Sequence, residues 1–413
     1  MIKKIKNCRA CGSRKLITLS KLGNQYLTGV FPSNKNIKIT NGPLEISKCN
    51  SNSECNLVQL SHKYDFRELY GKNYGYRSGL NKSMSKHLKS KTKYIMGKYN
   101  FNKKKPLIID IGSNDATTLK AYPKRKYELF GFDPTAKKFK EHYPKHIKYS
   151  SNFFSFELFK KIFKKKRAEI ITSFSMFYDL ENPIKFMNGI YNTLSDDGVW
   201  IFEQSYLPSM IKTMSFDTIC QEHLEYYTLH QIQYMCSITN FKIIDVEFNN
   251  INGGSFSITV SKKNSKYKEK IQLIKKIILK EKKNGFVDGF AWKKFNLKIN
   301  KVSKKILNFF NNSKKNNKII MGLGASTKGN VLLQYLKLNK KNILKIGDVN
   351  IDKHGKFTPG TGIPIVSEEE VLKENADYYF ILPWHFKSFF LNNKKFKNKK
   401  LVFPLPNFQI INN

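Results

Sequence analysis

A histidine, acidic side chains and two phenols gather in one eleven-residue segment, Asp217-Thr-Ile-Cys-Gln-Glu-His-Leu-Glu-Tyr-Tyr227. Histidine is the side chain whose ordinary pKa lets it take or give a proton near neutral pH. His223 is therefore a candidate general base, and Glu222 beside it is a candidate to tune that basicity. In isolation the pattern favours an amphipathic helix that opens at residue 222, with its acids in solvent and its tyrosines packed on a neighbour. The motifs around it favour catalysis instead.

The region that must position this segment alternates predicted strands and helices. Strands are predicted at residues 106–111, 127–132, 169–174 and 198–203, with helices between them, and a closing pair at 241–247 and 255–260. Such alternation predicts an α/β fold with a doubly wound parallel sheet. Asn252-Gly-Gly254 lies between the closing strands. It is either a hairpin turn or a place where the backbone approaches a ligand, and spacing alone does not separate the two.

The first of these strands ends in a nucleotide-fold turn. It reads Ile109-Asp-Ile-Gly-Ser-Asn114, and about 20 residues later Asp133 ends the second strand, where a carboxylate can accept both hydroxyls of a ribose. The turn has one glycine in place of the full G-x-G-x-x-G pattern. The class I methyltransferase version of the fold tolerates a single glycine followed by a small polar residue.

A second strand-to-helix turn follows near residue 320, as Gly322-Leu-Gly-Ala-Ser-Thr-Lys-Gly-Asn330. Backbone amides at the helix start, together with Lys328, are suited to hold a diphosphate. The spacing is not that of a Walker loop, and a tight glycine turn with a surface lysine explains this stretch equally well. Loops at 348–365, which contain Lys353 and His354, and at 382–386 are expected at strand ends, in a cleft that faces the middle domain.

Four of the six cysteines lie in the first 55 residues, at Cys8, Cys11, Cys49 and Cys55. Two such pairs can place four thiolates around a structural Zn²⁺, although the second pair has wider spacing than most zinc ribbons. A disulfide is disfavoured because we interpret the chain as cytoplasmic, with no signal peptide and no apolar run near 20 residues. Cys220 and Cys236 are expected to be buried small residues.

The formal charge of +43 invites a nucleic-acid interpretation. Only six of the 74 basic residues are arginines, however, and the planar arginine fork is what base and phosphate recognition uses most. The lysines are spread along the whole chain, as on ordinary solvated surfaces. We therefore expect neither a nucleic-acid nor a membrane partner, while the positive field helps to attract an anionic substrate such as a nucleotide diphosphate.

The order of these motifs resembles that of the sugar C-methyltransferases, which act on nucleotide-linked 4-keto-6-deoxyhexoses. The resemblance covers nearly the whole chain and rests on the cysteine lobe, the 109–114 turn, Glu222-His-Leu-Glu-Tyr-Tyr227, Asn252-Gly-Gly-Ser255 and Gly324-Ala-Ser-Thr-Lys-Gly-Asn330. It implies three domains. These are a zinc-binding domain (1–75), an S-adenosyl-L-methionine domain with the class I methyltransferase fold (76–263), and a C-terminal Rossmann-like domain that binds the nucleotide keto-sugar (264–413).

By the same resemblance, His223 removes the proton beside the ketone and the resulting enolate attacks the sulfonium methyl group. Glu222 would orient His223, and Tyr206, Tyr226 and Tyr227 are candidate donors to the ketone oxygen. The implied cofactor residues are Tyr74, Tyr76, Asp110, Gly112, Ser113, Asn114, Asp133, Pro134 and Ser175. The implied substrate residues are Glu203, Tyr206, Asn252, Gly253, Gly254, Ser255, Ser326, Lys328, Asn330, Lys353 and His354.

Two departures from the family pattern bear on the substrate. Relatives commonly carry Tyr-His where this chain has Cys220-Gln221, and the 175–180 stretch also differs. One alternative is therefore an O- or N-methyltransferase of a related sugar, which would not need an adjacent ketone. Another is a non-catalytic module, such as an RNA-binding protein with a decayed cofactor site. The product would belong to a surface polysaccharide or a secondary metabolite, and the enzyme would be a monomer or a homodimer.

Overall fold

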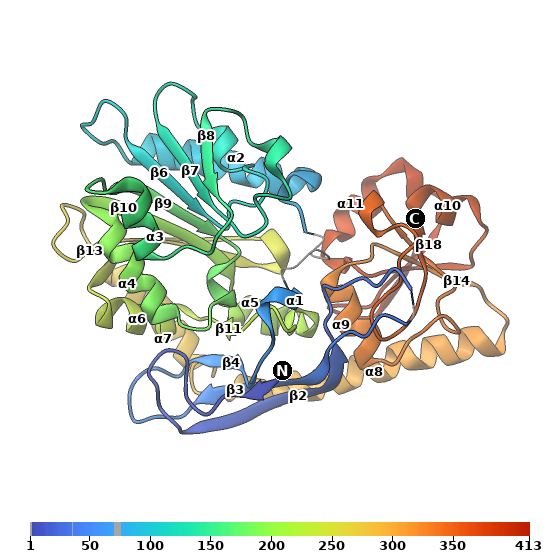
Figure 1. Ribbon diagram of the computed structural model, residues 1–413. Coiled ribbons are helices and arrows are strands. Elements are labelled where there is room, and N and C mark those ends of the chain that lie inside the picture. Colours follow the sequence, from blue (N-terminus) through green and yellow to red (C-terminus); the bar gives the residue numbers. More distant parts are fainter. Residues whose placement is uncertain (1, 35, 70–75) are drawn as a thin grey trace.

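The computed structural model describes residues 2–34, 36–69 and 76–413. Its strands form two large α/β units joined by an N-terminal lobe, with the middle unit on the left of Figure 1 and the C-terminal unit on the right. The lobe lies along the bottom of the view, where strand β2 (Leu16–Tyr26) runs toward the C-terminal unit. Across the described ranges, no helix combines the length and apolarity that crossing a bilayer requires.

The middle unit is a seven-stranded sheet of order β12-β13-β10-β9-β6-β7-β8. Strands β8, β7, β6, β9 and β10 are parallel, and β13 is antiparallel to both of its neighbours. Every residue of β6 is buried, as expected of a parallel strand covered on both faces. The predicted doubly wound sheet is confirmed. Its strands are β6 (Leu107–Ile111), β7 (Glu128–Phe132), β8 (Ile147–Ser150), β9 (Ala168–Phe174), β10 (Leu194–Ser205), β12 (Phe241–Asn249) and β13 (Ser255–Lys262).

Local sequence signals start the helices that cover this sheet. Asn81 accepts from the backbone amides of Ser83 and Met84 and begins α2, and Thr228 with Gln231 forms a capping box that begins α6. The helices of this unit are α2 (Lys82–Lys98), α3 (Phe156–Phe163), α4 (Pro183–Thr193), α5 (Leu207–Lys212) and α6 (Leu229–Ile238).

The C-terminal unit has a second parallel sheet, of order β16-β15-β14-β17-β18-β19, in which β19 alone among the described strands is antiparallel. A second α/β domain is therefore confirmed. Its elements are β14 (Ile320–Leu323), α9 (Thr327–Tyr335), β15 (Ile346–Asp348), β16 (Ile365–Ser367), α10 (Glu368–Lys373), β17 (Tyr378–Ile381), α11 (Lys387–Asn392), β18 (Lys400–Phe403) and β19 (Gln409–Asn412).

Two long helices between the units do more than connect them. Helix α7 (Ile271–Lys283) carries Glu281, a buried carboxylate that accepts from the first backbone amides of α6 at 2.8 and 3.0 Å. Helix α8 (Ala291–Lys315) buries Trp292, Phe295 and Ile299 in the same apolar core that holds residues of the lobe and the C-terminal unit. The lysine-rich stretch that contains α7 and α8 therefore joins all three parts.

The N-terminal lobe is a four-stranded sheet of order β11-β4-β3-β2. Its strands β2, β3 (Asn41–Cys49) and β4 (Val58–Leu60) come from the lobe itself, but β11 (Glu225–Tyr226) comes from the candidate catalytic segment. The lobe also contains β1 (Lys3–Lys4), β5 (His62–Lys63) and α1 (Phe66–Leu69). The helix considered for residues 222–227 is thus wrong, because tertiary pairing makes a strand of these residues.

Candidate active site

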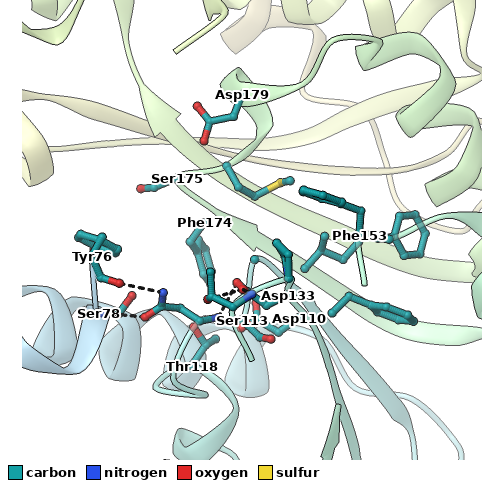
Figure 2. A pocket seen from close by; sticks show the side chains of 18 of the residues that line it. Tyr76, Ser78, Asp110, Ser113, Thr118, Asp133, Phe153, Phe174, Ser175 and Asp179 are labelled. Carbon is teal, nitrogen blue, oxygen red and sulfur yellow. Dashed lines mark hydrogen bonds between the residues drawn. The ribbon is translucent and has the colours of Figure 1, made fainter. Parts of the chain in front are cut away.

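A cavity of about 330 Å³ opens at the carboxyl ends of the parallel strands of the middle unit. Figure 2 shows Tyr76 and Phe153 at opposite sides of the view, with Asp110, Ser113 and Asp133 between them. The predicted cofactor residues within the described ranges all line this cavity: Tyr76, Asp110, Gly112, Ser113, Asn114, Asp133, Pro134 and Ser175. Tyr74 lies outside the described residues.

The turn after β6 is held against the end of β7 by one carboxylate. Asp133 accepts from the Asn114 backbone amide at 2.8 Å and from the Thr135 backbone amide at 2.6 Å. Gly112 has φ 78°, a conformation that side chains disfavour, and a Cβ there would lie 3.1 Å from Met176 Cγ. This explains why the turn needs a glycine at that position.

A second buried carboxylate stands at the floor of the cavity. Asp110 accepts from the Thr172 hydroxyl at 2.6 Å, and burial raises the pKa of Asp110 to about 7. Ser113 lines the cavity, but its hydroxyl is hydrogen-bonded to the Tyr143 hydroxyl at 2.9 Å. A bound cation would favour the charged form of Asp110.

Aromatic residues outside the predicted set form another part of the wall. Phe153 lines the cavity with 60% of its surface exposed, and its ring meets that of Phe66 edge-on at 6.4 Å. The sequence signal for them was weak, because the strand-to-helix connections that hold them, β5 to α1 and β8 to α3, contain no glycine motif. S-adenosylmethionine requires an aromatic surface for its base, carboxylates for its hydroxyls, and negative charge near its sulfonium and amine. The residues that line this cavity fit those requirements.

His223 lies in the turn before β11 and is oriented by the backbone. Its Nδ1 atom donates to the Thr218 carbonyl at 2.8 Å, which leaves Nε2 as the basic nitrogen. The Tyr178 ring meets the imidazole edge-on at 4.5 Å, and Tyr178 continues the 175–180 turn that lines the cofactor cavity. Burial, with a smaller effect of the Lys328 charge, lowers the pKa of His223 to about 4. His223 is therefore neutral at physiological pH, as a general base must be.

The expectation that Glu222 orients His223 is wrong, because Glu222 faces the N-terminal lobe. Its Oε2 accepts from the Thr28 hydroxyl at 3.4 Å, and a Cβ on Gly29 would lie only 2.3 Å from its Oε1. Gln221, which replaces the histidine of the family pattern, donates to the Gln25 carbonyl at 3.1 Å. Both side chains fasten the lobe to the catalytic segment.

Of the three tyrosines proposed as donors, two are committed elsewhere. Tyr206 donates to Glu281 at 2.7 Å, and Tyr227 is fully buried and stacks on Phe177 at 5.4 Å between ring centroids. Tyr226 instead lines a small cavity together with His223. Tyr226 remains a candidate donor, whereas the bond to Glu281 removes Tyr206 and stacking on Phe177 within the core removes Tyr227.

A half-buried lysine reaches the catalytic segment from the C-terminal unit. Lys328, in the first turn of α9, donates to the Asn252 carbonyl at 3.0 Å, and its charge interacts with Asp217. Burial lowers the pKa of Lys328, while the Asp217 charge opposes that shift. The surface-lysine alternative is wrong, because Lys328 is half-buried and bonds to a backbone carbonyl of the middle unit.

Two residues that were absent from the predicted set complete this cluster. Trp384 donates to the Asp217 carboxylate at 2.7 Å, and burial raises the pKa of Asp217 to about 6. His385 is half-buried near Lys328, and partial burial lowers its pKa to about 3. The only sequence signal for them was the polar loop after β17. The cluster therefore holds one lysine cation among neutral imidazoles and a carboxylate.

The other residues predicted to bind substrate form hydrogen bonds within the protein. Glu203 is the clearest correction, since both of its carboxylate oxygens are used at the sheet edge, by His87 at 2.6 Å and Asn249 at 2.9 Å. The remaining bonds are Ser255 to the Ile251 carbonyl (2.9 Å), Gly329 amide to Ser326 (3.0 Å), Asn330 to the Thr28 carbonyl (2.7 Å), Lys353 to the Ala325 carbonyl (2.6 Å) and His354 to the Asp348 carbonyl (2.8 Å).

The glycine turn between β12 and β13 supplies the carbonyl that holds Lys328. Asn252 and Gly253 both have positive φ, and Gly254 has φ 118° with Ser209 Cβ only 2.5 Å from where its own Cβ would lie. We expect Gly254→Ala to lower the free energy of unfolding by about 2–4 kcal/mol, through backbone strain and overpacking. Urea unfolding measures this. Gly97→Ala is the matched control, because a Cβ in that helix meets no atom within 4 Å and should be neutral or stabilising.

The low pKa of His223 predicts an unusual acid limb of kcat/KM. A histidine with an ordinary pKa would lose about tenfold in neutral fraction between pH 8 and 5.5. With a pKa of about 4, protonation of His223 should remove only a few per cent. Because Asp217 titrates near 6, the profile is measured in both wild type and Asp217→Asn. A fall in kcat/KM with a midpoint near pH 6.5 that persists in Asp217→Asn would contradict the neutral state of His223.

The four cysteines of the lobe converge as expected for a metal site. Their sulfur atoms all lie within 4.8 Å of one another, with Cys8 and Cys55 at 3.7 Å and Cys11 and Cys49 at 3.5 Å. Tetrahedral Zn²⁺ with Zn–S bonds near 2.3 Å requires sulfur separations of about 3.8 Å. The donor set and its spacing therefore fit zinc.

Comparison with known families accounts for nearly the whole chain. Residues 8–70 match a zinc binding domain, residues 80–246 a methyltransferase domain, and residues 250–406 the C-methyltransferase C-terminal domain. The chain belongs to the zinc-containing C-methyltransferases. This C-methyltransferase thus binds S-adenosylmethionine in its middle domain and zinc in its N-terminal domain.

Individual relatives of this C-methyltransferase are distant. It is 22% identical to C-methyltransferase NovU of Streptomyces niveus over 417 residues, covering 100% of this chain and 98% of that protein. Among solved structures, the plantazolicin methyltransferase BpumL in complex with S-adenosylhomocysteine is 15% identical, covering 45% of this chain and 87% of that one, with a TM-score of 0.36. A chain from the complex between the Haloferax volcanii activator Trm112 and a methyltransferase is 9% identical. The match covers 44% of this chain and 94% of that one, with a TM-score of 0.36.

Proposed function

We propose that this C-methyltransferase methylates a carbon beside the ketone of a nucleotide-linked keto-deoxysugar. The observation that carries the proposal is a neutral, half-buried base, His223, within the electrostatic reach of a half-buried cation, Lys328. A proton on carbon is removed only when the negative charge that develops can be stabilised nearby. A base and a cation brought together from two domains are the groups that enolisation of a ketone needs.

The proposed reaction assigns one task to each side chain. His223 Nε2 takes the proton from the carbon, and the electron pair of that C–H bond moves toward the ketone oxygen. Lys328 stabilises the oxygen as it becomes negative, in the role that the absent family tyrosine leaves open at Cys220. Bound S-adenosylmethionine supplies an electrophilic methyl group. The enolate carbon forms a bond to that methyl as the methyl–sulfur bond breaks.

The location of the two groups also supports a substrate held between domains. His223 follows the lobe-facing residues 221 and 222, and Lys328 begins helix α9 of the C-terminal unit (Figure 1). The 175–180 turn joins this region to the cofactor cavity, since the Leu224 amide donates to the Tyr178 carbonyl at 2.8 Å. We infer that the sugar lies at this junction, and that its nucleotide extends along the C-terminal unit.

The test uses methyl-labelled S-adenosylmethionine with a panel of nucleoside-diphosphate 4-keto-6-deoxyhexoses, each paired with the sugar whose ketone has been reduced. We expect label on carbon, seen by NMR, for at least one ketone and for none of the reduced sugars. Equal labelling of a reduced sugar would favour O-methylation and overturn the proposal. Absence of S-adenosylhomocysteine binding by calorimetry would move the chain to a recognition role.

A further inference from the structure

The catalytic segment is a strand of the N-terminal lobe's sheet. In the antiparallel pairing of β11 with β4, Glu225 lies opposite Gln59 and Tyr226 opposite Val58. The Leu60 amide also donates to the Leu224 carbonyl at 2.8 Å. This strand begins two residues after His223, while β4 begins three residues after Cys55. Strand β4, which follows the metal site, therefore sets the register of β11, which follows the candidate base.

An arginine inside the first cysteine pair makes a second link. Arg9 lies between Cys8 and Cys11 and is buried. Its backbone amide donates to the Gln59 side chain at 3.1 Å, and its Nη1 donates to the Leu60 carbonyl at 2.6 Å. The position of the guanidinium thus depends on the loop that the metal closes and on strand β4.

The same guanidinium supplies the counter-charge for a carboxylate of the catalytic segment. Arg9 Nε lies 3.7 Å from Glu225 Oε1, and the two side chains are 2% and 0% exposed. Neither carboxylate oxygen of Glu225 has a hydrogen-bond partner within the described chain. Glu225 also lines the small cavity that contains His223. Burial raises the pKa of Glu225 and the Arg9 charge opposes that shift, so the ionised carboxylate is tolerated only while Arg9 stays in place.

We propose that the four-cysteine zinc site positions the general base, through Arg9, Glu225 and the β4–β11 pairing. Zinc holds the loop that carries Arg9, Arg9 neutralises Glu225, and Glu225 keeps β11 and the preceding turn in register. Arg9 and Glu225 are positioning residues, because they act on His223 and not on the substrate. The inference rests on the proposed role of His223, but the link between the metal and the segment can be measured without any substrate.

The cofactor cavity provides an internal reference for this link. Its carboxylates, Asp110 and Asp133, stand at the ends of β6 and β7, which pair with β9 and β8 and not with the lobe. Loosening of β11 reaches this cavity through the Leu224 amide, which donates to the Tyr178 carbonyl, so cofactor affinity should change much less than amide exchange of the segment. A general loss of folding would instead affect both regions together.

The experiment follows amide hydrogen exchange of residues 217–228 by mass spectrometry, alongside calorimetric titration with S-adenosylhomocysteine. It compares the zinc-loaded protein with chelator-treated protein and with Glu225→Gln and Arg9→Met. The matched control is Lys21→Gln, which breaks an ion pair between the exposed Lys21 and Glu45, 3.9 Å apart, within the lobe. The double variant Arg9→Met with Glu225→Leu removes both charges at once and is included in case a single variant fails to fold.

We expect exchange of residues 217–228 to become at least about tenfold faster on zinc removal and in both single variants, with cofactor affinity within about threefold of wild type. The control should match wild type, and the double variant should recover protection relative to the singles. Unchanged exchange of the segment after zinc removal would overturn the proposal. So would parallel loss of cofactor affinity, which would indicate a general structural role. Failure to find a methylated sugar would leave these readouts intact and would count against the proposed reaction alone.

Discussion

Replacing His223 with alanine is expected to lower kcat by about 10³-fold while leaving S-adenosylhomocysteine affinity within about threefold of wild type. The loss arises because the His223 Nε2 atom is the proton acceptor that the proposed reaction assigns to the carbon beside the ketone. The cofactor cavity does not include His223, so binding should persist. Single-turnover methyl transfer and calorimetry measure the two effects separately.

Added imidazole offers a sharper form of the same test. A small base that enters the space left in His223→Ala should restore part of the turnover, and the restored rate should rise with pH through the pKa of free imidazole. The control is His146→Ala, which should keep wild-type turnover. His146 lies just before β8, far along the chain from the catalytic segment. Turnover in His223→Ala close to that of wild type would remove the general-base role.

Replacing Lys328 with methionine is expected to lower kcat by about 10²–10³-fold, the range found when a donor to a developing oxyanion is removed. Methionine preserves most of the apolar stem but carries no charge. The same variant should lose exchange of the substrate's α-hydrogen with deuterated solvent in the presence of S-adenosylhomocysteine. That exchange reports enolisation without methyl transfer.

The alternative role of Lys328 predicts a different result. If this lysine held the diphosphate of the substrate, the methionine variant would raise KM while kcat and α-hydrogen exchange survived. Lys328→Arg should not rescue the reaction, because the larger planar group does not fit the space beside Asp217 and the Asn252 carbonyl. Lys340→Met, an exposed lysine after α9, controls for loss of one positive charge.

Several features of the fold and site were predictable because local sequence decides them. Strand β6 is a short apolar run that ends at Gly112, and parallel strands buried on both faces require such runs. Asp133 ends the second strand about 20 residues later because one helix-length crossover separates parallel neighbours. Cys8 and Cys11 also form a recognisable pair, since metal-ligand spacing within a loop is local geometry.

The strand in the catalytic segment could not be predicted from local sequence. Residues 222–227 have a mixed polar and aromatic pattern that suits a helix face as well as a strand, and an isolated two-residue strand has no sequence signature. Its partner, β4, lies more than 160 residues earlier in the chain. The strand exists because the lobe offers an open sheet edge, and that edge is present only in the folded protein.

The sequence by itself determined the domain order, the two parallel sheets, the four-cysteine cluster and the position of a histidine among acidic and phenolic groups. Only the tertiary structure decided what those groups contact: Glu222 with Thr28, Tyr206 with Glu281, Lys328 with Asp217, and Arg9 with Glu225. Helix and strand periods are set by neighbours a few residues apart. The partner of a buried polar side chain is set by which distant surfaces pack together, and burial then changes the pKa that determines its chemistry.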